Sequence, residues 1–381
     1  MLALMVPGLA TAGPEFARVF GDHMVLPMER RVPVWGKADP GSELSLEMGS
    51  FVSHAKADAD GGWRIDLPPM AASSVGRVLT LRADGAVVSI RDVLIGRVWL
   101  CSGQSNMDFP LAKALGGSEE STGAAGFQAI RLCNWSGAPT DARIYQDAEF
   151  SRLNTRDHFR GTWKTAESAA EISAIAWWAA RIVHEKTKVP IGIVENAVGG
   201  SPMEAWLPVE TLRSRPDYAG LLGSSWLDCP KMSPWAGSRA RRNLGEHIDG
   251  NHPFRPGFLF ESGIRPWCGF PFDAVLWYQG ETNAETDDEA WHRRMLEDLV
   301  VGWRRALGNK EMPFIMVQLP RIGGNDPLRK YWPGFRKAQA AVASSVPGVS
   351  LVKTVDLGWD SPDVHPPDKK PVAERAAALL E

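Results

Sequence analysis

The sequence predicts an α/β protein in which a small all-β sandwich precedes a parallel sheet covered by helices on both faces. Strand-like runs separated by turn residues fill residues 14–95, and apolar strands alternate with amphipathic helices over residues 96–381. The length of 381 residues also favours two domains over a single core. The hydrophobic fraction of 44% and the charged fraction of 23% are those of an ordinary globular protein.

The chain opens with a short apolar segment, residues 1–13, which contains Ala10-Thr11-Ala12. This pattern resembles the A-x-A cleavage site of a secretory signal peptide, although the usual positively charged start is missing. We interpret the segment as a signal-peptide remnant and expect a periplasmic or secreted protein. No apolar run approaches the length of a membrane span, so we expect no membrane partner.

Charge and cysteine content narrow the function classes further. A net charge of −3 provides no general attraction to nucleic acid, and we expect no nucleic-acid partner. The four cysteines have neither CxxC spacing nor histidines at zinc-finger distance, so we expect no metal site. Their number permits one or two disulfides without requiring any, and Cys101 is expected to be a buried free thiol.

The all-β region shows short strands about a dozen residues apart. The turn signals between them are Asp39-Pro40-Gly41, Asp60-Gly61 and Asp84-Gly85. This spacing is typical of a small sandwich. The predicted strands are Val32–Trp35, Leu44–Met48, Trp63–Leu67, Val78–Leu81 and Val87–Ile90.

The second region alternates strands with helices. In Trp291–Leu307 apolar residues recur every four positions, Ser173–Lys188 has one apolar side, and a last helix is expected from Pro371. Such alternation is typical of a parallel sheet with helices on both faces. The predicted strands are Val98–Cys101, Pro190–Glu195, Ala274–Tyr278, Phe314–Leu319 and Val349–Val355.

An irregular stretch, Leu212–Pro266, interrupts this alternation and is rich in Pro, Gly, Ser and Arg. It is too long for an ordinary connection, so it is either an insertion that forms part of a pocket wall or a partly mobile lid. Its basic run, Arg239–Arg242, is able to meet an anionic ligand, but we expect a solvated surface there.

Two segments far apart in the sequence predict a nucleophile and its base. The strand Val98–Cys101 runs into the turn Gly103–Met107, which can expose the hydroxyl of Ser105 at the carboxyl end of a parallel strand. His365, beside Asp363, follows the last predicted strand and therefore belongs to the same edge of the sheet. We predict that Ser105 and His365 meet there.

Two further turns follow predicted strands and supply hydrogen-bond donors. Gly199 and Gly200 allow backbone N–H groups to approach a substrate closely. Gln279 and Asn283 carry amides able to donate to an oxyanion, and we expect Glu281 between them to be a structural partner. Four such turns at one rim predict a catalytic site.

These blocks resemble the SGNH-hydrolase superfamily, and specifically its sialate O-acetylesterase branch. The resemblance rests on Cys101–Met107, Pro190–Trp206, Val275–Ala284 and Asp356–Lys370, with the stretch ISAIAWWAARIVHEKTKVPIGIVENAVGGSPMEAW over Ile172–Trp206 especially similar. The β-rich region resembles that branch as well, and together the matches cover most of the chain outside the irregular stretch. The resemblance implies a flavodoxin-like three-layer sandwich for the catalytic region.

The resemblance also implies roles for individual residues. Ser105 would be the nucleophile and His365 the general base. The superfamily usually has its aspartate three residues before the histidine, where Pro362 stands here, so Asp363, Asp360 or a backbone carbonyl is left to orient His365. The oxyanion donors would be the Ser105 N–H, a glycine N–H (Gly200 rather than Gly199) and an amide of Gln279 or Asn283. Gln104 is a further candidate for substrate binding.

The predicted reaction is hydrolysis of a sugar O-acetyl ester through an acetyl-enzyme on Ser105, with no metal or organic cofactor. Sialate is the expected sugar, and acetylated xylan or another glycan is the alternative. A non-catalytic glycan-binding protein is the candidate from another class. A lipase-like α/β-hydrolase is disfavoured, since its G-x-S-x-G elbow would need glycine where Met107 stands. The oligomeric state is not predicted.

Overall fold

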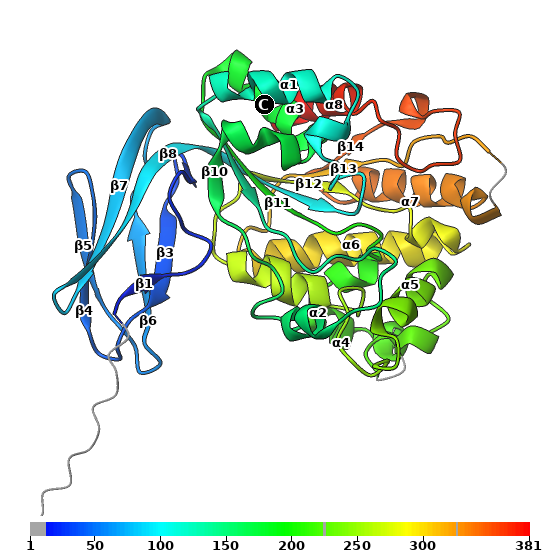
Figure 1. The fold of residues 1–381 in the computed structure, drawn as a ribbon, viewed down its shortest axis with the longest axis horizontal. Helices are drawn as coiled ribbons and strands as arrows, with labels where there is room; N and C mark the ends of the chain where they lie inside the picture. Colours follow the sequence, from blue (N-terminus) through cyan, green and yellow to red (C-terminus); the bar gives the residue numbers. More distant parts are fainter. Residues whose placement is uncertain (1–12, 224–225, 325–326) are drawn as a thin grey trace, which may run out of the picture.

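The computed structural model describes residues 13–223, 226–324 and 327–381. The predicted signal-peptide remnant lies outside these ranges except for Gly13. An all-strand part stands beside a larger part in which helices surround a central sheet (Figure 1). None of the helices in the described ranges is long and apolar enough to cross a membrane.

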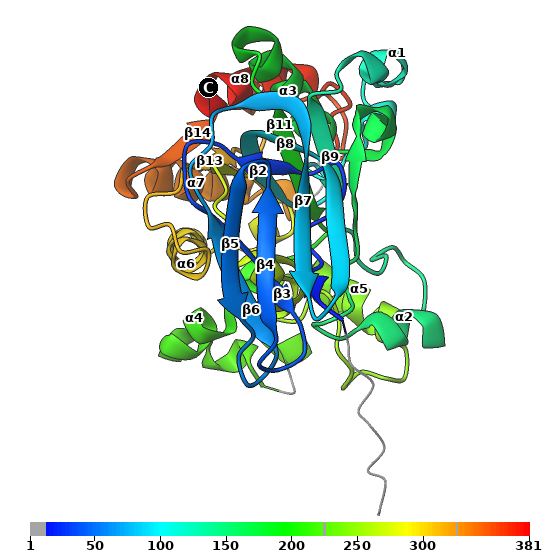
Figure 2. The same cartoon turned by 90° about the vertical axis from the view of Figure 1, so that its left-hand side faces the viewer.

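The first eight strands form the all-strand part (Figure 2). Three of them make one antiparallel sheet in the order β1-β3-β6, while β5, β4, β7 and β8 pair antiparallel in a second sheet, with β2 parallel to β8. The strands are β1 (Glu15–Phe16), β2 (Val25–Pro27), β3 (Val32–Lys37), β4 (Glu43–Met48), β5 (Phe51–Lys56), β6 (Gly62–Leu67), β7 (Ser73–Ala83) and β8 (Ala86–Gly103).

Strand β8 joins the two parts. Its 18 residues contain both Val87–Ile90 and Val98–Cys101, which the sequence pattern predicts as two separate strands. The first half pairs with β7, and the second half is the central strand of the large sheet. The predicted boundary at residue 95 therefore falls inside a continuous strand.

The large sheet has the strand order β10-β9-β11-β8-β12-β13-β14, parallel except for β10 at its edge. The four predicted strands after β8 are present, whereas β9 and β10 are additional. The chain first moves from β8 to β9 and β11 on one side and then to β12 on the other, so the strand order reverses at β8. The strands are β9 (Ile130–Asn134), β10 (Trp163–Thr165), β11 (Ile191–Ala197), β12 (Ala274–Tyr278), β13 (Phe314–Val317) and β14 (Val349–Val352).

Helices cover both faces of this sheet, as predicted. In Figure 1, α1, α3 and α8 lie above it, and α6 lies below it with α7 packed alongside. The helices are α1 (Gly117–Gly123), α2 (Asp147–Arg152), α3 (Ala174–Thr187), α4 (Val209–Ser214), α5 (Pro234–Leu244), α6 (Glu289–Ala306), α7 (Trp332–Ser345) and α8 (Lys370–Leu380). Ser173 and Asp288 begin α3 and α6 by accepting hydrogen bonds from the backbone N–H groups of Ala176 and Trp291.

The irregular stretch Leu212–Pro266 folds into α5 and several short helical turns. Its apolar side chains, among them Trp226, Phe254 and Phe260, are buried in the main core. All four cysteines are free thiols, and Cys101 is fully buried in β8, as the sequence indicates.

Candidate active site

The serine turn follows β8 at the point where the strand order reverses. Gly103 has φ +138°, and a Cβ at this position would lie 2.0 Å from the Tyr278 carbonyl oxygen, so only glycine fits. The next residue, Gln104, donates its backbone N–H to that same oxygen at 2.9 Å. The turn is thus fixed against β12, and Ser105 is half-buried at the carboxyl end of the sheet.

Ser105, His365 and Asp363 form a hydrogen-bonded chain. The Ser105 Oγ lies 2.7 Å from His365 Nε2, and His365 Nδ1 lies 2.7 Å from Asp363 Oδ1. The same Asp363 oxygen accepts the backbone N–H of His365 at 3.1 Å. Within the described ranges His365 makes no hydrogen bond with Asp360 or with a backbone carbonyl, so Asp363 alone contacts the ring nitrogen that faces away from Ser105.

This chain lies partly in solvent. The His365 side chain is 32% exposed and that of Asp363 is 55% exposed. Trp359 holds the aspartate's loop by donating its indole N–H to the Asp363 carbonyl at 2.7 Å. Water therefore screens the interaction between Asp363 and His365 more than in a buried triad.

The glycine turn after β11 lies beside the serine. A Cβ built on Gly199 would be 3.8 Å from the Ser105 Cβ, and Gly200 has φ +70°. A side chain at Gly200 would meet the Trp235 ring at 2.2 Å. In the described part of the chain, neither the Ser105 N–H nor the Gly200 N–H donates a hydrogen bond, so both are free to bind an oxyanion.

The amides of Gln279 and Asn283 are placed differently from the sequence expectation. Both side chains are buried, and neither lines the pocket in front of Ser105. Gln279 Nε2 donates to Ser201 O and Asn283 Oδ1, while Asn283 Nδ2 donates to Glu204 at 2.9 Å. Burial raises the pKa of Glu204 to about 7. These amides connect the β11 and β12 turns to each other.

Gln104 does line the pocket. Its Oε1 accepts the backbone N–H groups of Gly280 and Thr282 at 3.3 and 3.4 Å. Since the oxygen is thereby fixed to backbone donors, its Nε2 is the end of the amide left for other partners.

A buried polar cluster lies behind the serine and histidine turns. Asn106 donates to Glu281 and to the Val364 carbonyl, the latter at 2.8 Å, and accepts from the ammonium of Lys369. All three polar side chains are at most 3% exposed. Burial raises the pKa of Glu281 and lowers that of Lys369 to about 7. Glu281 thus bonds to Asn106 of the serine turn, outside its own block, and also lines the pocket, whereas Lys369 is not singled out by the sequence pattern.

An open pocket with a volume of about 410 Å³ lies in front of Ser105 and His365. Its far wall includes Trp235 and Arg239 from α5, with Arg329 beside them. The guanidinium of Arg239 stacks over the Trp235 ring at 4.9 Å. The irregular stretch is therefore part of the pocket wall, and Arg239 is half-buried there instead of lying on a solvated surface.

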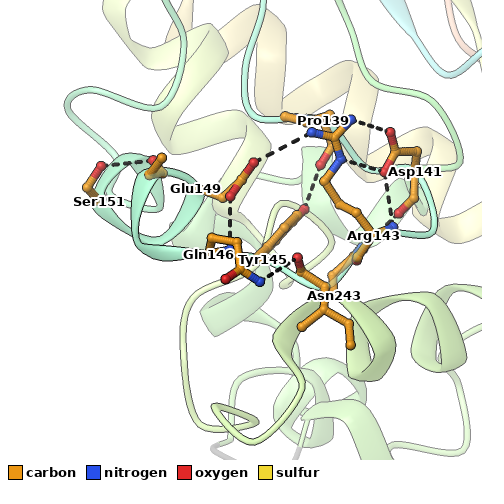
Figure 3. A network of polar contacts seen from close by, with 10 residues as sticks. Pro139, Asp141, Arg143, Tyr145, Gln146, Glu149, Ser151 and Asn243 are labelled. Atoms are coloured by element: carbon orange, nitrogen blue, oxygen red, sulfur yellow. Dashed lines mark hydrogen bonds and ion pairs between the residues drawn. The ribbon is translucent and has the colours of Figure 1, made fainter.

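The adjoining part of the wall comes from the loop after β9, through Thr140 and Asp141. Figure 3 shows how this loop is held: Arg143 pairs with Asp141, and Asn243 on α5 donates to the carbonyls of Asp141 and Arg143. The hydrogen bonds from Arg143 lower the pKa of Asp141 to about 2, so this carboxylate stays charged but paired. Sequence reasoning missed these residues because β9 was not recognised as a strand.

Within the described residues, no group of three His, Cys, Asp or Glu side chains is arranged to hold a metal ion. The groups at this site are those that acyl transfer uses: a hydroxyl, an imidazole and unpaired backbone N–H groups.

Comparison with known proteins supports the same chemistry. The family model described as carbohydrate esterase, sialic acid-specific acetylesterase, matches residues 95–218 and 266–373. The chain belongs to this esterase family. The resemblance noted in the sequence is thereby confirmed, and the protein is a carboxylic ester hydrolase. The esterase contains Ser105, Gly200 and His365 inside the matched ranges, whereas Trp235 and Arg239 lie in the unmatched stretch between them.

Individual relatives agree with this assignment. The sialate O-acetylesterases of Pongo abelii and Homo sapiens are each 27% identical to the esterase, over 98% of its chain and 72% of theirs. The crystal structure of a carbohydrate acetylesterase from Xanthomonas citri superposes with a TM-score of 0.74 at 30% identity, covering 96% of this chain and 74% of that one.

Proposed function

We propose that this esterase removes O-acetyl groups from sialate through an acetyl-enzyme on Ser105. The observation that carries the proposal is the continuous contact Ser105–His365–Asp363, at 2.7 Å for each step, at the mouth of a pocket lined by arginines. Such a chain is able to activate a hydroxyl for attack on an ester carbonyl.

In the first half of the reaction, His365 Nε2 takes the proton of Ser105 Oγ as that oxygen attacks the acetyl carbonyl. Asp363 holds the proton on Nδ1, which leaves Nε2 free to act as the base. The imidazolium then protonates the departing sugar oxygen. In the second half, the same nitrogen deprotonates a water molecule that releases acetate from Ser105.

The oxyanion that forms on the acetyl carbonyl needs donors. The unpaired N–H groups of Ser105 and Gly200 are the best placed, and the Gln104 amide lies in the same pocket. Gln279 and Asn283 are better suited to holding the turns, because their amide nitrogens already donate elsewhere. Gly199 contributes the carbonyl side of the peptide that carries the Gly200 N–H.

The arginines favour an acidic sugar. Arg239 and Arg329 line the pocket together with three carboxylates, those of Asp141, Glu281 and Glu285. Arg329 pairs with Glu285 at 3.6 Å and Arg239 donates one N–H to Thr140, so a sugar carboxylate would bind through the other N–H groups of Arg239. Sialate carries a carboxylate and xylan does not. Neutral acetylated glycans are therefore the second candidate, since the catalytic residues themselves do not distinguish the two classes.

Acetate release from three compounds tests this substrate: O-acetylated sialate, the methyl ester of the same sugar, and an acetylated xylo-oligosaccharide. We expect the free acid to have a kcat/KM roughly 10- to 100-fold above its methyl ester, as the loss of a charged hydrogen bond implies. Equal values for the acid and its ester, with preference for the xylo-oligosaccharide, would reject sialate.

Labelling tests the catalytic claim separately. An organophosphonate should attach to Ser105 in the wild-type protein and leave Ser105→Ala protein unlabelled. A wild-type protein that is not labelled would instead indicate a glycan-binding protein without activity.

The remaining proposals concern architecture and location. The reversal of strand order at β8 and the helices on both faces support a flavodoxin-like SGNH-hydrolase layering for residues 96–381, with residues 14–95 as a β-sandwich domain. The apolar segment at residues 1–13 supports export to the periplasm or the medium.

A further inference from the structure

The loop at residues 139–141 is held by a side chain at each of its three carbonyls. Figure 3 shows two of the donors, Tyr145 and Asn243, whose side chains are buried. The three bonds are Tyr145 Oη to Pro139 O at 2.9 Å, Arg239 Nη1 to Thr140 O at 2.8 Å and Asn243 Nδ2 to Asp141 O at 2.7 Å. The backbone on both sides of Thr140 is therefore fixed, and little freedom remains for its side chain.

The hydroxyl of Thr140 reaches the glycine turn. Thr140 Oγ1 donates to the carbonyl oxygen of Gly199 at 2.8 Å. That oxygen and the N–H of Gly200 belong to one peptide group. Because this peptide is trans, the N–H points away from the oxygen that Thr140 holds. A donor on one end of the group thus sets the direction of the other end.

We propose that Thr140 is a positioning residue for the oxyanion site: its hydroxyl orients the Gly199–Gly200 peptide so that the Gly200 N–H is directed at the developing oxyanion. This inference rests on the proposed function, in which that N–H is a donor. It adds a residue from the β9 loop, which contacts neither Ser105 nor His365 by a hydrogen bond.

Two physical effects favour this role. The hydrogen bond from the Ser201 N–H to the Val198 carbonyl closes the glycine turn at 3.1 Å, but such a turn permits two orientations of its central peptide. Because glycine adopts either one readily, the bond from Thr140 favours one of the two. In addition, a hydrogen bond to a carbonyl polarises its peptide and strengthens the N–H at the other end as a donor. Both effects act on the transition state and leave the binding of the ground-state ester largely unchanged.

The test compares an aryl acetate with the matching aryl thionoacetate, whose C=S sulfur accepts hydrogen bonds weakly. In Thr140→Val we expect kcat/KM for the acetate to fall roughly tenfold, mainly through kcat, as the loss of one hydrogen bond implies. The kcat/KM for the thionoacetate should fall less, so the ratio of kcat/KM for the acetate to that for the thionoacetate becomes smaller. Thr140→Ser should restore the wild-type preference, and Thr140→Ala should repeat the loss without the bulk of valine.

Thr187→Val is the matched control, because Thr187 Oγ1 donates to the Val183 carbonyl at 2.8 Å at the far end of α3. Its oxygen preference should equal that of the wild type. Equal losses on both esters in Thr140→Val, or no rescue by serine, would overturn the inference while Ser105→Ala remains inactive. Wild-type turnover in Ser105→Ala would overturn the proposed function as well, so the two failures are distinguishable.

Discussion

The exposure of Asp363 leads to an unusual prediction about its asparagine variant. In buried serine–histidine–aspartate triads, asparagine in place of the aspartate costs about 10⁴-fold in kcat, because the amide stabilises the wrong tautomer of the histidine. Here Asp363 Oδ1 accepts both the ring Nδ1–H and the backbone N–H of His365, at 2.7 and 3.1 Å. In Asp363→Asn the backbone N–H selects the amide oxygen, which then still accepts from the ring.

The expected magnitudes follow from this geometry. A charged hydrogen bond contributes about 1.5–3 kcal/mol when shielded and an exposed ion pair about 0.2–1 kcal/mol. With the Asp363 side chain 55% exposed, we take about 1–2 kcal/mol for the whole interaction. Asp363→Ala should then lower kcat/KM about 5- to 30-fold, at tenfold per 1.4 kcal/mol. Asp363→Asn keeps a neutral hydrogen bond and should lose only about 2- to 5-fold.

The assay is continuous release of the phenolate from an aryl acetate at pH 8, with His365→Ala as the reference for complete loss of the base. The expected order of activity is wild type, Asp363→Asn, Asp363→Ala and then His365→Ala. An asparagine variant less active than the alanine variant would refute the reasoning, because it would show that the amide nitrogen faces the ring.

Three other perturbations test the site and its surroundings. Ser105→Ala and His365→Ala should each lower kcat by roughly 10⁴-fold or more with unchanged circular dichroism. Turnover at the wild-type rate in either variant would exclude the substituted residue as nucleophile or base. Gly200→Ala should lower the free energy of unfolding by about 1–3 kcal/mol in urea melts, since φ is +70° and the added methyl group meets the Trp235 ring; unchanged melts would contradict this geometry. The pKa of Lys369 is about 7 in the folded protein, below its usual 10.5, so the unfolded chain binds more protons between these values and wild-type stability rises from pH 7 to 10.5 and is lost as the pH falls. Lys369→Met lacks this dependence, so its stability relative to the wild type should be lower at pH 9.5 than at pH 7, and a pH-independent difference would contradict the burial of a titrating ammonium.

The convergence of the proposed catalytic residues could be predicted because they obey a rule of parallel sheets. Ser105, Gly200 and His365 each follow a strand, and the carboxyl ends of parallel strands meet at one edge. The same rule brings Gln279 and Asn283 to this edge but does not say which way a side chain turns. Their burial depends on Glu204 and Ser201, which offer acceptors inside the protein. The position of a residue after a strand predicts the edge of the sheet at which it lies, whereas nearby hydrogen-bond acceptors determine whether its side chain points into the protein or into the pocket.

Continuity between strands was harder to predict. The sequence predicts Val87–Ile90 and Val98–Cys101 as separate strands, and the charged residues Arg91 and Asp92 lie between them. Asp92 instead has φ +55° and pairs with His23 and Arg131, so the charged residue is accommodated without a break in β8. Neither partner is near it in the sequence.

The pocket wall shows where local patterns stop being informative. Trp235 and Arg239 lie on α5, within a stretch whose Pro, Gly and Ser content indicates loops. Ser233 begins this helix by accepting the N–H of Ala236, and Asn243 near its end holds the β9 loop. The pocket wall is formed by two irregular segments, the α5 stretch and the β9 loop, which are joined by hydrogen bonds. Neither segment carries a periodic sequence pattern that would predict this contact.

The buried cluster also explains why the aspartate can be exposed. The backbone of the histidine turn is fixed directly beside His365 by the hydrogen bond from Asn106 to the Val364 carbonyl. Lys369 anchors the same turn to Asn106 a few residues later, and the side chains of Asn106 and Lys369 are both buried. Since the turn is positioned from the protein side, the proposed mechanism leaves Asp363 with the narrower task of selecting the tautomer and stabilising the imidazolium. A half-exposed carboxylate suffices for that task, and for this reason the loss of Asp363 should be far milder than the loss of His365.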